Sequence, residues 1–262
     1  LSGKKARATA NYFVMCCGGI ETARLLLASN RSGSEGIGAS ARLTGRYFLE
    51  HIHIHVPLHL SKRKEFENMF NTRRQNGRYC FAKIASTLAF QKSHRILNVA
   101  ADLIYLSERQ TAAVAAKNLI QASSRKDYLG MFSELSTIFR NPTESIRALH
   151  RYIFLKRKLG EGIGYPHLCF QTELVPIPES KVTLSSEKDA LDIPKTSLEW
   201  RITPQAIRTV KVFARAVDQE LRTKGLGQLD LSILPTSDNP EEAKDLINDS
   251  YHHMGTTRMH EM

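Results

Sequence analysis

The N-terminal part of the chain has the pattern of a strand, a tight turn and a helix. Residues 12–17 form a short apolar run rich in strand-favouring side chains, so we expect a strand that is buried on both faces. Gly18 and Gly19 predict the turn, and the Leu-rich segment 20–29, with an acid in its first turn, predicts a helix. A unit of this kind is typical of a doubly wound α/β domain.

The middle of the chain is predicted to be mainly helical. Residues 30–45 are rich in Gly and Ser and predict a loop, whereas His and apolar residues alternate over 51–60 and predict a half-buried strand. From 62 to 160 the apolar residues follow a helical spacing. That region includes a basic amphipathic helix at 143–158, which begins after the break at Pro142.

The C-terminal part of the chain alternates between strands and turns before a long helix. Three strands of an antiparallel sheet are predicted at residues 168–175, 181–185 and 197–202. Pro204 lies near the first turn of a helix that we expect to run to about Lys224, where Gly225 ends it. Residues 235–250 predict a polar loop with a short helix.

Composition narrows the class of protein. Hydrophobic residues make up 42% of the chain and charged residues 24%, which is typical of a globular protein with a real core. No apolar run reaches the roughly 18 residues that span a bilayer. The net charge of +11 is compatible with nucleic acid, an anionic membrane surface or acidic substrates. Because the basic segments lack interleaved aromatic residues and match no nucleic-acid motif, we predict no nucleic-acid partner and keep membrane-surface contact as a minor alternative.

The cysteines and histidines do not predict a metal site. Four cysteines match neither a zinc-ligand spacing nor a disulfide framework: Cys16, Cys17, Cys80 and Cys169. We therefore expect buried thiols in a reducing compartment and a cytoplasmic location. Four histidines fall in the predicted strand: His51, His53, His55 and His59. Two or three of them could meet a metal, but no acidic or Cys partner stands at a set spacing, so we favour a solvated strand face with no metal.

Several segments, in order along the chain, carry a resemblance to a known family. They are residues 17–29, 38–51, 173–184 and 251–259. The first segment has Gly-Gly before a Leu-rich helix, and the second has a Gly-Arg-Tyr-Phe run that ends near a His. The third segment has Pro-x-Pro followed by Ser-Lys-Val-x-Leu, and the last has His-His-Met-Gly-Thr. In this order and spacing they resemble the glucose–methanol–choline (GMC) oxidoreductase family. The chain departs from the family pattern at four places: Ala23, Lys181, Asp192 and His253.

The resemblance implies a fold and a division into domains. It implies part of an FAD-binding doubly wound α/β domain, formed by residues 1–50 and 245–262, and a substrate domain over 51–244, whose antiparallel sheet is covered by helices. No G-x-G-x-x-G dinucleotide fingerprint occurs in the sequence. We therefore expect an internal piece of a longer flavoenzyme, with the fingerprint before Leu1 and a second catalytic His or Asn after Met262.

The resemblance also implies a reaction. His252 corresponds to the family's catalytic His and would act as the base that takes the proton of a substrate hydroxyl, while hydride passes to FAD. An imidazole suits this task because its pKa lies near neutrality. The residues expected to bind the cofactor are Gly18, Gly19, Ile20, Gly255 and Thr256. The substrate would be a small alcohol, a sugar or a sterol; neither it nor the electron acceptor is identified further.

Other interpretations remain open at this point. Thr256 and Arg258 either touch the flavin or hold the loop, and His253 is expected to be structural. The chain by itself is expected to bind FAD weakly or not at all and not to turn over. The alternatives to a working enzyme are a non-enzymatic, basic, helix-rich module that docks on an anionic surface, and an inactive paralogue that keeps the fold.

Overall fold

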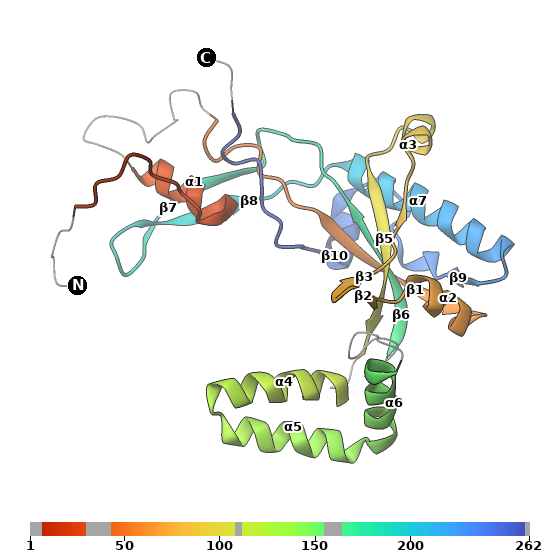
Figure 1. Cartoon of the computed structure of the whole chain (residues 1–262). Helices are drawn as coiled ribbons and strands as arrows, with labels where there is room; N and C mark the ends of the chain where they lie inside the picture. The colour runs from red at the N-terminus through yellow and green to blue at the C-terminus, as the bar shows by residue number, and fades with distance from the viewer. Residues whose placement is uncertain (1–6, 30–42, 108–111, 155–163, 260–262) are drawn as a thin grey trace. The chain divides into compact units, whose positions relative to one another are not determined.

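A computed structural model describes residues 7–29, 43–107, 112–154 and 164–259 (Figure 1). The chain divides into two compact units. The first contains the described residues up to Ile52, together with Glu173–Ala206 and those from Ile247 on. The second contains the described residues of His53–Thr172 and of Ile207–Leu246.

The first unit is built on a helix that lies against a hairpin. Helix α1 (Gly18–Ala28) packs on strands β7 (Lys181–Lys188) and β8 (Pro194–Glu199), which are antiparallel to each other. Its core is formed by Ala23, Phe48 and Val182, with Ile20 and Trp200 packed against them. The unit therefore joins segments that are far apart in the sequence.

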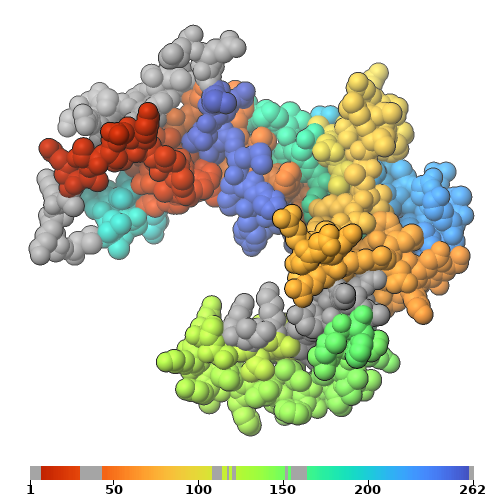
Figure 2. All heavy atoms as spheres, viewed as in Figure 1, coloured from red at the N-terminus to blue at the C-terminus, as the bar shows by residue number. Residues whose placement is uncertain are grey.

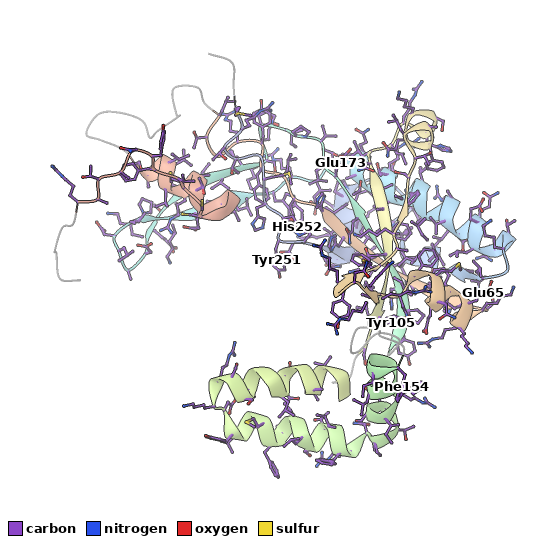
Figure 3. The ribbon with its side chains drawn as sticks, viewed as in Figure 1. Glu65, Tyr105, Phe154, Glu173, Tyr251 and His252 are labelled. Carbon is purple, nitrogen blue, oxygen red and sulfur yellow. The ribbon has the colours of Figure 1, made fainter. Side chains whose placement is uncertain are left out.

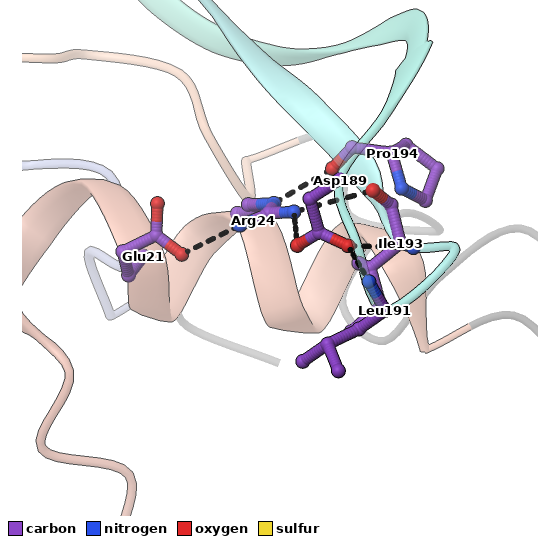
Figure 4. Close-up of polar contacts among 6 residues, drawn as sticks. All are labelled: Glu21, Arg24, Asp189, Leu191, Ile193 and Pro194. Carbon is purple, nitrogen blue, oxygen red and sulfur yellow. Dashed lines mark hydrogen bonds and ion pairs between the residues drawn. The ribbon is translucent and has the colours of Figure 1, made fainter. Parts of the chain in front are cut away.

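Arg24 ties α1 to the turn between β7 and β8 (Figure 4). Its Nε donates to the carbonyl of Pro194 at 2.6 Å, and its Nη2 lies 2.6 Å from Oδ2 of Asp189. The other carboxylate oxygen of Asp189 accepts from the backbone N–H of Leu191 and of Ile193. The hydrogen bond from Arg24, followed by that from Ile193, holds the pKa of Asp189 below its usual value.

The second unit is built on an antiparallel sheet in which strand order follows β1-β6-β5-β4, with β9 beside β1. The strands are β1 (Ile52–Leu60), β4 (Ile84–Ala85), β5 (Val99–Leu106), β6 (Tyr165–Thr172) and β9 (Gly227–Leu229). The pairs β4/β5, β5/β6 and β1/β9 are antiparallel, and the register places Asp102 opposite Cys169.

Helix α7 (Pro204–Thr223) covers one face of this sheet (Figure 1). Its buried apolar residues recur at helical spacing: Ala206, Ile207, Val210, Phe213, Ala214, Val217 and Leu221. The ring of Phe213 meets that of Phe170 of β6 edge to face, with 6.1 Å between centroids. Because neighbouring strand residues point to opposite faces, Cys169 lies on the face of β6 away from α7.

Smaller elements complete the chain. They are α2 (Arg63–Phe70), β2 (Arg73–Gln75), β3 (Arg78–Cys80), α3 (Leu88–His94), η1 (Leu231–Ile233), η2 (Pro240–Leu246) and β10 (Ile247–Asn248). Helices α4 (Ala112–Arg125), α5 (Tyr128–Arg140) and α6 (Pro142–Ile153) pack on one another, and their atoms form the green cluster of Figure 2. Asp127 caps α5 by accepting from the N–H of Gly130 at 2.9 Å. Among the described residues, no helix is both long and apolar enough to cross a membrane.

Most predicted elements of the C-terminal part are confirmed. The expected strands at 168–175, 181–185 and 197–202 correspond to β6, β7 and β8, although β6 belongs to a different sheet from the β7–β8 pair. The predicted long helix corresponds to α7, the strand at 51–60 to β1, and the helix at 20–29 to α1. The loop expected at 30–45 and the end of the helix expected at 143–158 fall largely outside the described residues.

One prediction about secondary structure is wrong, and another is incomplete. Residues 12–17 are not a buried strand: no strand is assigned there, and Tyr12 is 88% exposed. An apolar run forms a strand only beside another strand, and the described residues place none next to it. The region 62–160 is mainly helical, as predicted, but it also contains β2, β3, β4 and β5, which the sequence pattern did not predict. In β5 the residues Ala100, Ala101 and Leu103 favour helices, and pairing with β6 overrides that preference.

The cysteine prediction is wrong for three residues of four. Cys16, Cys17 and Cys80 are exposed, and only Cys169 is buried. The first two lie in the extended segment just discussed. Residues 173–206, which the sequence places in the substrate domain, cluster with the N-terminal and C-terminal segments. The assignment of domains stays a prediction, as does the doubly wound FAD-binding domain.

Candidate functional site

Three segments of the first unit converge at the candidate site. They are the Gly18-Gly19 turn at the start of α1, residues 45–51, and residues 250–258. Leu49 and Met254 form an antiparallel bridge in which each backbone N–H donates to the other residue's carbonyl, at 2.9 and 3.0 Å. The backbone N–H of Gly45 donates to the carbonyl of Thr256 at 2.8 Å. The backbone thus fixes the segment that contains His252.

Glu50 holds the turn that precedes this bridge. Its side chain is almost completely buried, and one carboxylate oxygen accepts from the backbone N–H of His252 at 2.9 Å and from the hydroxyl of Ser250. The other oxygen lies 2.9 Å from Nε2 of His253. Burial alone would raise the pKa of Glu50. The hydrogen bonds from Ser250 and His252 and the nearby His253 outweigh it, so this pKa is lowered and the carboxylate stays charged at neutral pH.

The two adjacent histidines have different surroundings. His253 is half-buried, faces Glu50, and its ring lies 5.5 Å from that of Phe48. His252, labelled in Figure 3, is exposed. Its ring meets that of His51 edge-on, with 5.7 Å between the ring centroids. The backbone of His252 is therefore held in place by Glu50 while its imidazole is presented at the surface of the unit.

Two glycines allow the segments to approach closely. Gly255 has a φ of +89°, and a Cβ added there would stand 1.9 Å from the carbonyl oxygen of Tyr47. A Cβ added at Gly19 would stand 2.8 Å from the carbonyl oxygen of His253. A side chain at either position would push apart the backbone segments that form the site.

The remaining predicted site residues divide by role. The hydroxyl of Thr256, which is 1% exposed, donates to the carbonyl of Gly19, and Ile20 packs on the core of the unit. Gly18 differs from these, because an added Cβ there would meet no atom within 4 Å from the part of the chain that the structure describes, its neighbours and helix backbone apart. The structure thus brings the predicted residues together. It gives most of them a structural task and leaves the backbone of Gly18 and the side chain of His252 open.

Sequence reasoning missed Glu50 and did not decide between the alternatives at Arg258. The guanidinium of Arg258 lies 4.5 Å from the ring centroid of Tyr47, a contact that holds the loop. A single carboxylate ahead of a strand has no local pattern that marks it. The only available signal was the position of Glu50 in the Gly-Arg-Tyr-Phe-Leu-Glu-His run, next to His51.

Comparison with known families decides the assignment. The sequence model of a family described as GMC oxidoreductase matches residues 176–261. This C-terminal part of the chain belongs to the GMC oxidoreductase family. The matched part begins at Pro176, the first residue of the Pro-x-Pro segment, and continues through β7, β8 and α7. It includes His252, Gly255 and Thr256. The predicted membership is confirmed. No curated protein matches the chain.

The family match supports an oxidoreductase without naming its substrate. The antiparallel sheet with helices agrees with the substrate domain expected from the sequence. The roles of individual residues are a separate matter, which the local geometry informs.

Proposed function

We propose that this chain provides part of the active site of an FAD-dependent oxidoreductase that acts on the CH–OH group of a small alcohol. In this proposal His252 takes the proton from the substrate hydroxyl. The observation that carries it is the fixed turn: Glu50 binds the backbone N–H of His252, and this turn lies within the part of the chain that matches the GMC family.

The residues at the start of α1 suit an anionic cofactor. The first N–H groups of a helix have no partner inside the helix, and they attract negative charge. At Gly18 the backbone is open to a ligand, because no atom of the described residues beyond its chain neighbours and its own helix backbone lies within 4 Å of the position where a Cβ would stand. FAD bound there would supply the acceptor for the hydride. Gly19, Gly255 and Thr256 would act indirectly, by holding the backbone against this turn.

His252 is a better candidate for the base than its neighbour. The ring of His253 is engaged by the carboxylate of Glu50, so it is not available to a substrate. The ring of His252 is exposed, and its backbone position does not depend on its own side chain. Glu50 is then a positioning residue, because it orients the turn and leaves the imidazole of His252 to accept the proton.

The proposal is tested by anaerobic reduction of flavin in the product of the complete open reading frame that encodes this sequence. FAD absorbance is followed after addition of primary and secondary alcohols, sugars and sterols. We expect bleaching with at least one of these substrates. The variant His252→Asn should lower the rate of reduction about 10²- to 10⁴-fold, the usual contribution of a general base. FAD content should be unchanged.

His59→Asn is the matched control, because His59 is an exposed histidine on β1. Its rate of flavin reduction should equal that of the unchanged protein. A His252→Asn protein that reduces flavin at the normal rate would show that this histidine is not the base. Absence of reduction by every alcohol would refute the proposed reaction as a whole.

A further inference from the structure

A cluster of metal-binding side chains lies in the second unit. It contains His53 and His55 of β1 and Cys169 of β6. One ligand atom from each residue, a ring nitrogen or the sulfur, lies within 4.8 Å of the other two. The two histidines are half-buried and the cysteine is buried, so this part of β1 is not the fully solvated face that the sequence suggested.

Strand geometry explains why these residues meet. In β1 the alternate residues Ile52, Ile54 and Val56 are buried, and the histidines between them point to the other face. In the neighbouring strand β6, Phe170 points toward α7 and Cys169 points away from it. Cys169 is distant from the histidines in the sequence, which is why no ligand spacing was visible there.

The surroundings of the cluster are polar. Asp102 stands opposite Cys169 in the β5–β6 register, and its carboxylate accepts from Nε2 of Gln171 at 2.7 Å. The same amide nitrogen lies 3.9 Å from the sulfur of Cys169. Lys83 lies 3.4 Å from the carboxylate of Asp102. A carboxylate held beside the cluster would offset the charge of a cation and orient the groups around it.

We propose that His53, His55 and Cys169 form a binding site for one Zn²⁺ ion, with a water molecule in the fourth position. Two imidazole nitrogens and one thiolate form a ligand set that zinc accepts, in tetrahedral geometry. With Zn–N of about 2.1 Å and Zn–S of about 2.3 Å, tetrahedral ligand atoms lie roughly 3.5 Å apart, so the three side chains need only small rotations. On binding, the S–H bond of Cys169 breaks, its proton passes to water and its sulfur bonds the metal.

A bound ion would link β1 to β6 through their side chains, in addition to the backbone hydrogen bonds of the sheet. It involves neither FAD nor an alcohol. The proposal is therefore independent of the proposed oxidoreductase reaction, and its failure would leave that reaction untouched.

The test is titration of the full chain, stripped with a chelator, with Zn²⁺ in the presence of a chromogenic competitor. We expect one equivalent of zinc per chain. Cys169→Ser and His55→Gln should each weaken the affinity at least about 10-fold, the lower bound for loss of even an indirect partner of a metal. Cobalt in place of zinc should give a sulfur-to-metal charge-transfer band that disappears in Cys169→Ser.

Two matched variants serve as controls. Cys80→Ser removes an exposed thiol of β3, and His59→Gln removes an exposed histidine of β1, and both should bind zinc like the unchanged chain. Far-ultraviolet circular dichroism checks that each variant is folded. Two results would overturn the proposal: less than one equivalent bound to the folded chain, or equal affinity in Cys169→Ser, His55→Gln and the unchanged chain.

Discussion

Replacement of Glu50 by Gln tests the role of the buried carboxylate at the candidate site. The change keeps the size of the side chain and one oxygen acceptor, but it removes the negative charge. That charge receives hydrogen bonds from the backbone of His252 and the hydroxyl of Ser250, and it faces Nε2 of His253 at 2.9 Å.

The expected cost follows from these contacts. A hydrogen bond to a charged group contributes about 1.5–3 kcal/mol, and a neutral one about 0.5–1.5 kcal/mol, so each of the two donors loses roughly 1 kcal/mol. We therefore expect Glu50→Gln to lower the free energy of unfolding by about 2 kcal/mol near pH 6.5. Because the pKa of Glu50 is lowered in the folded chain, its stabilisation is present above about pH 4.5, the ordinary value. It is lost as the pH falls through the folded pKa.

The assay is urea unfolding followed by fluorescence of Trp200. This is the only tryptophan in the sequence, and it packs on the core of the first unit, the unit that contains Glu50. Unfolding is measured from pH 7 down to pH 3. The difference between the variant and the unchanged chain should be largest above pH 5 and should shrink toward zero as the pH falls below about 4.5.

A matched control separates this effect from a general effect of charge. Glu220 is an exposed glutamate of α7 paired with Lys224, and Glu220→Gln should change the free energy of unfolding by less than about 0.5 kcal/mol at every pH. A Glu50→Gln difference that stays constant with pH would contradict the reasoning. So would a variant as stable as the unchanged chain at pH 6.5.

Three further predictions concern stability. Gly255→Ala should lower the free energy of unfolding, followed by Trp200 fluorescence, by at least about 2 kcal/mol, because a positive φ and a clash with Tyr47 combine. Gly18→Ala, with a similar φ of +80° but no clash, should lower it by only about 1 kcal/mol, and equal losses would contradict this. Lys211→Met should cost about 1–3 kcal/mol by circular dichroism, because the buried ammonium donates to two carbonyls and to Asp238, and Lys224→Met should change little. Asp192→Gly should raise stability by up to about 0.5 kcal/mol by Trp200 fluorescence, because Asp192 has a φ of +63° that glycine adopts without strain; a loss would show that the ion pair with Lys188 matters more.

The success of the sequence analysis depended on how local each signal was. The alternation in β1 and the helical spacing in α7 each reflect one buried face, so they could be predicted within a segment. The strand β5 could not, because its helix-favouring residues adopt a strand only when β6 is beside them. The prediction for residues 12–17 was wrong for the opposite reason: this segment is apolar, but no strand among the described residues pairs with it.

The same distinction holds for the candidate site. The order His252, Gly255, Thr256 is a contiguous motif, and it identified the segment that the structure places against Gly19. Glu50 is distant in sequence from the turn it holds, so its role follows only from the fold. Cys169 and His55 were considered separately for the same reason, and only the register of the sheet brings them together.

The contact between Arg24 and Asp189 has a consequence for the order of folding. The two residues are 165 positions apart, and the chain between them includes most of the second unit. Closing so long a loop costs conformational entropy, and non-local contacts of this kind form slowly. During synthesis α1 leaves the ribosome long before its partner turn exists. We therefore expect the sheet between them to fold first, and the first unit to assemble last by the meeting of its separated segments.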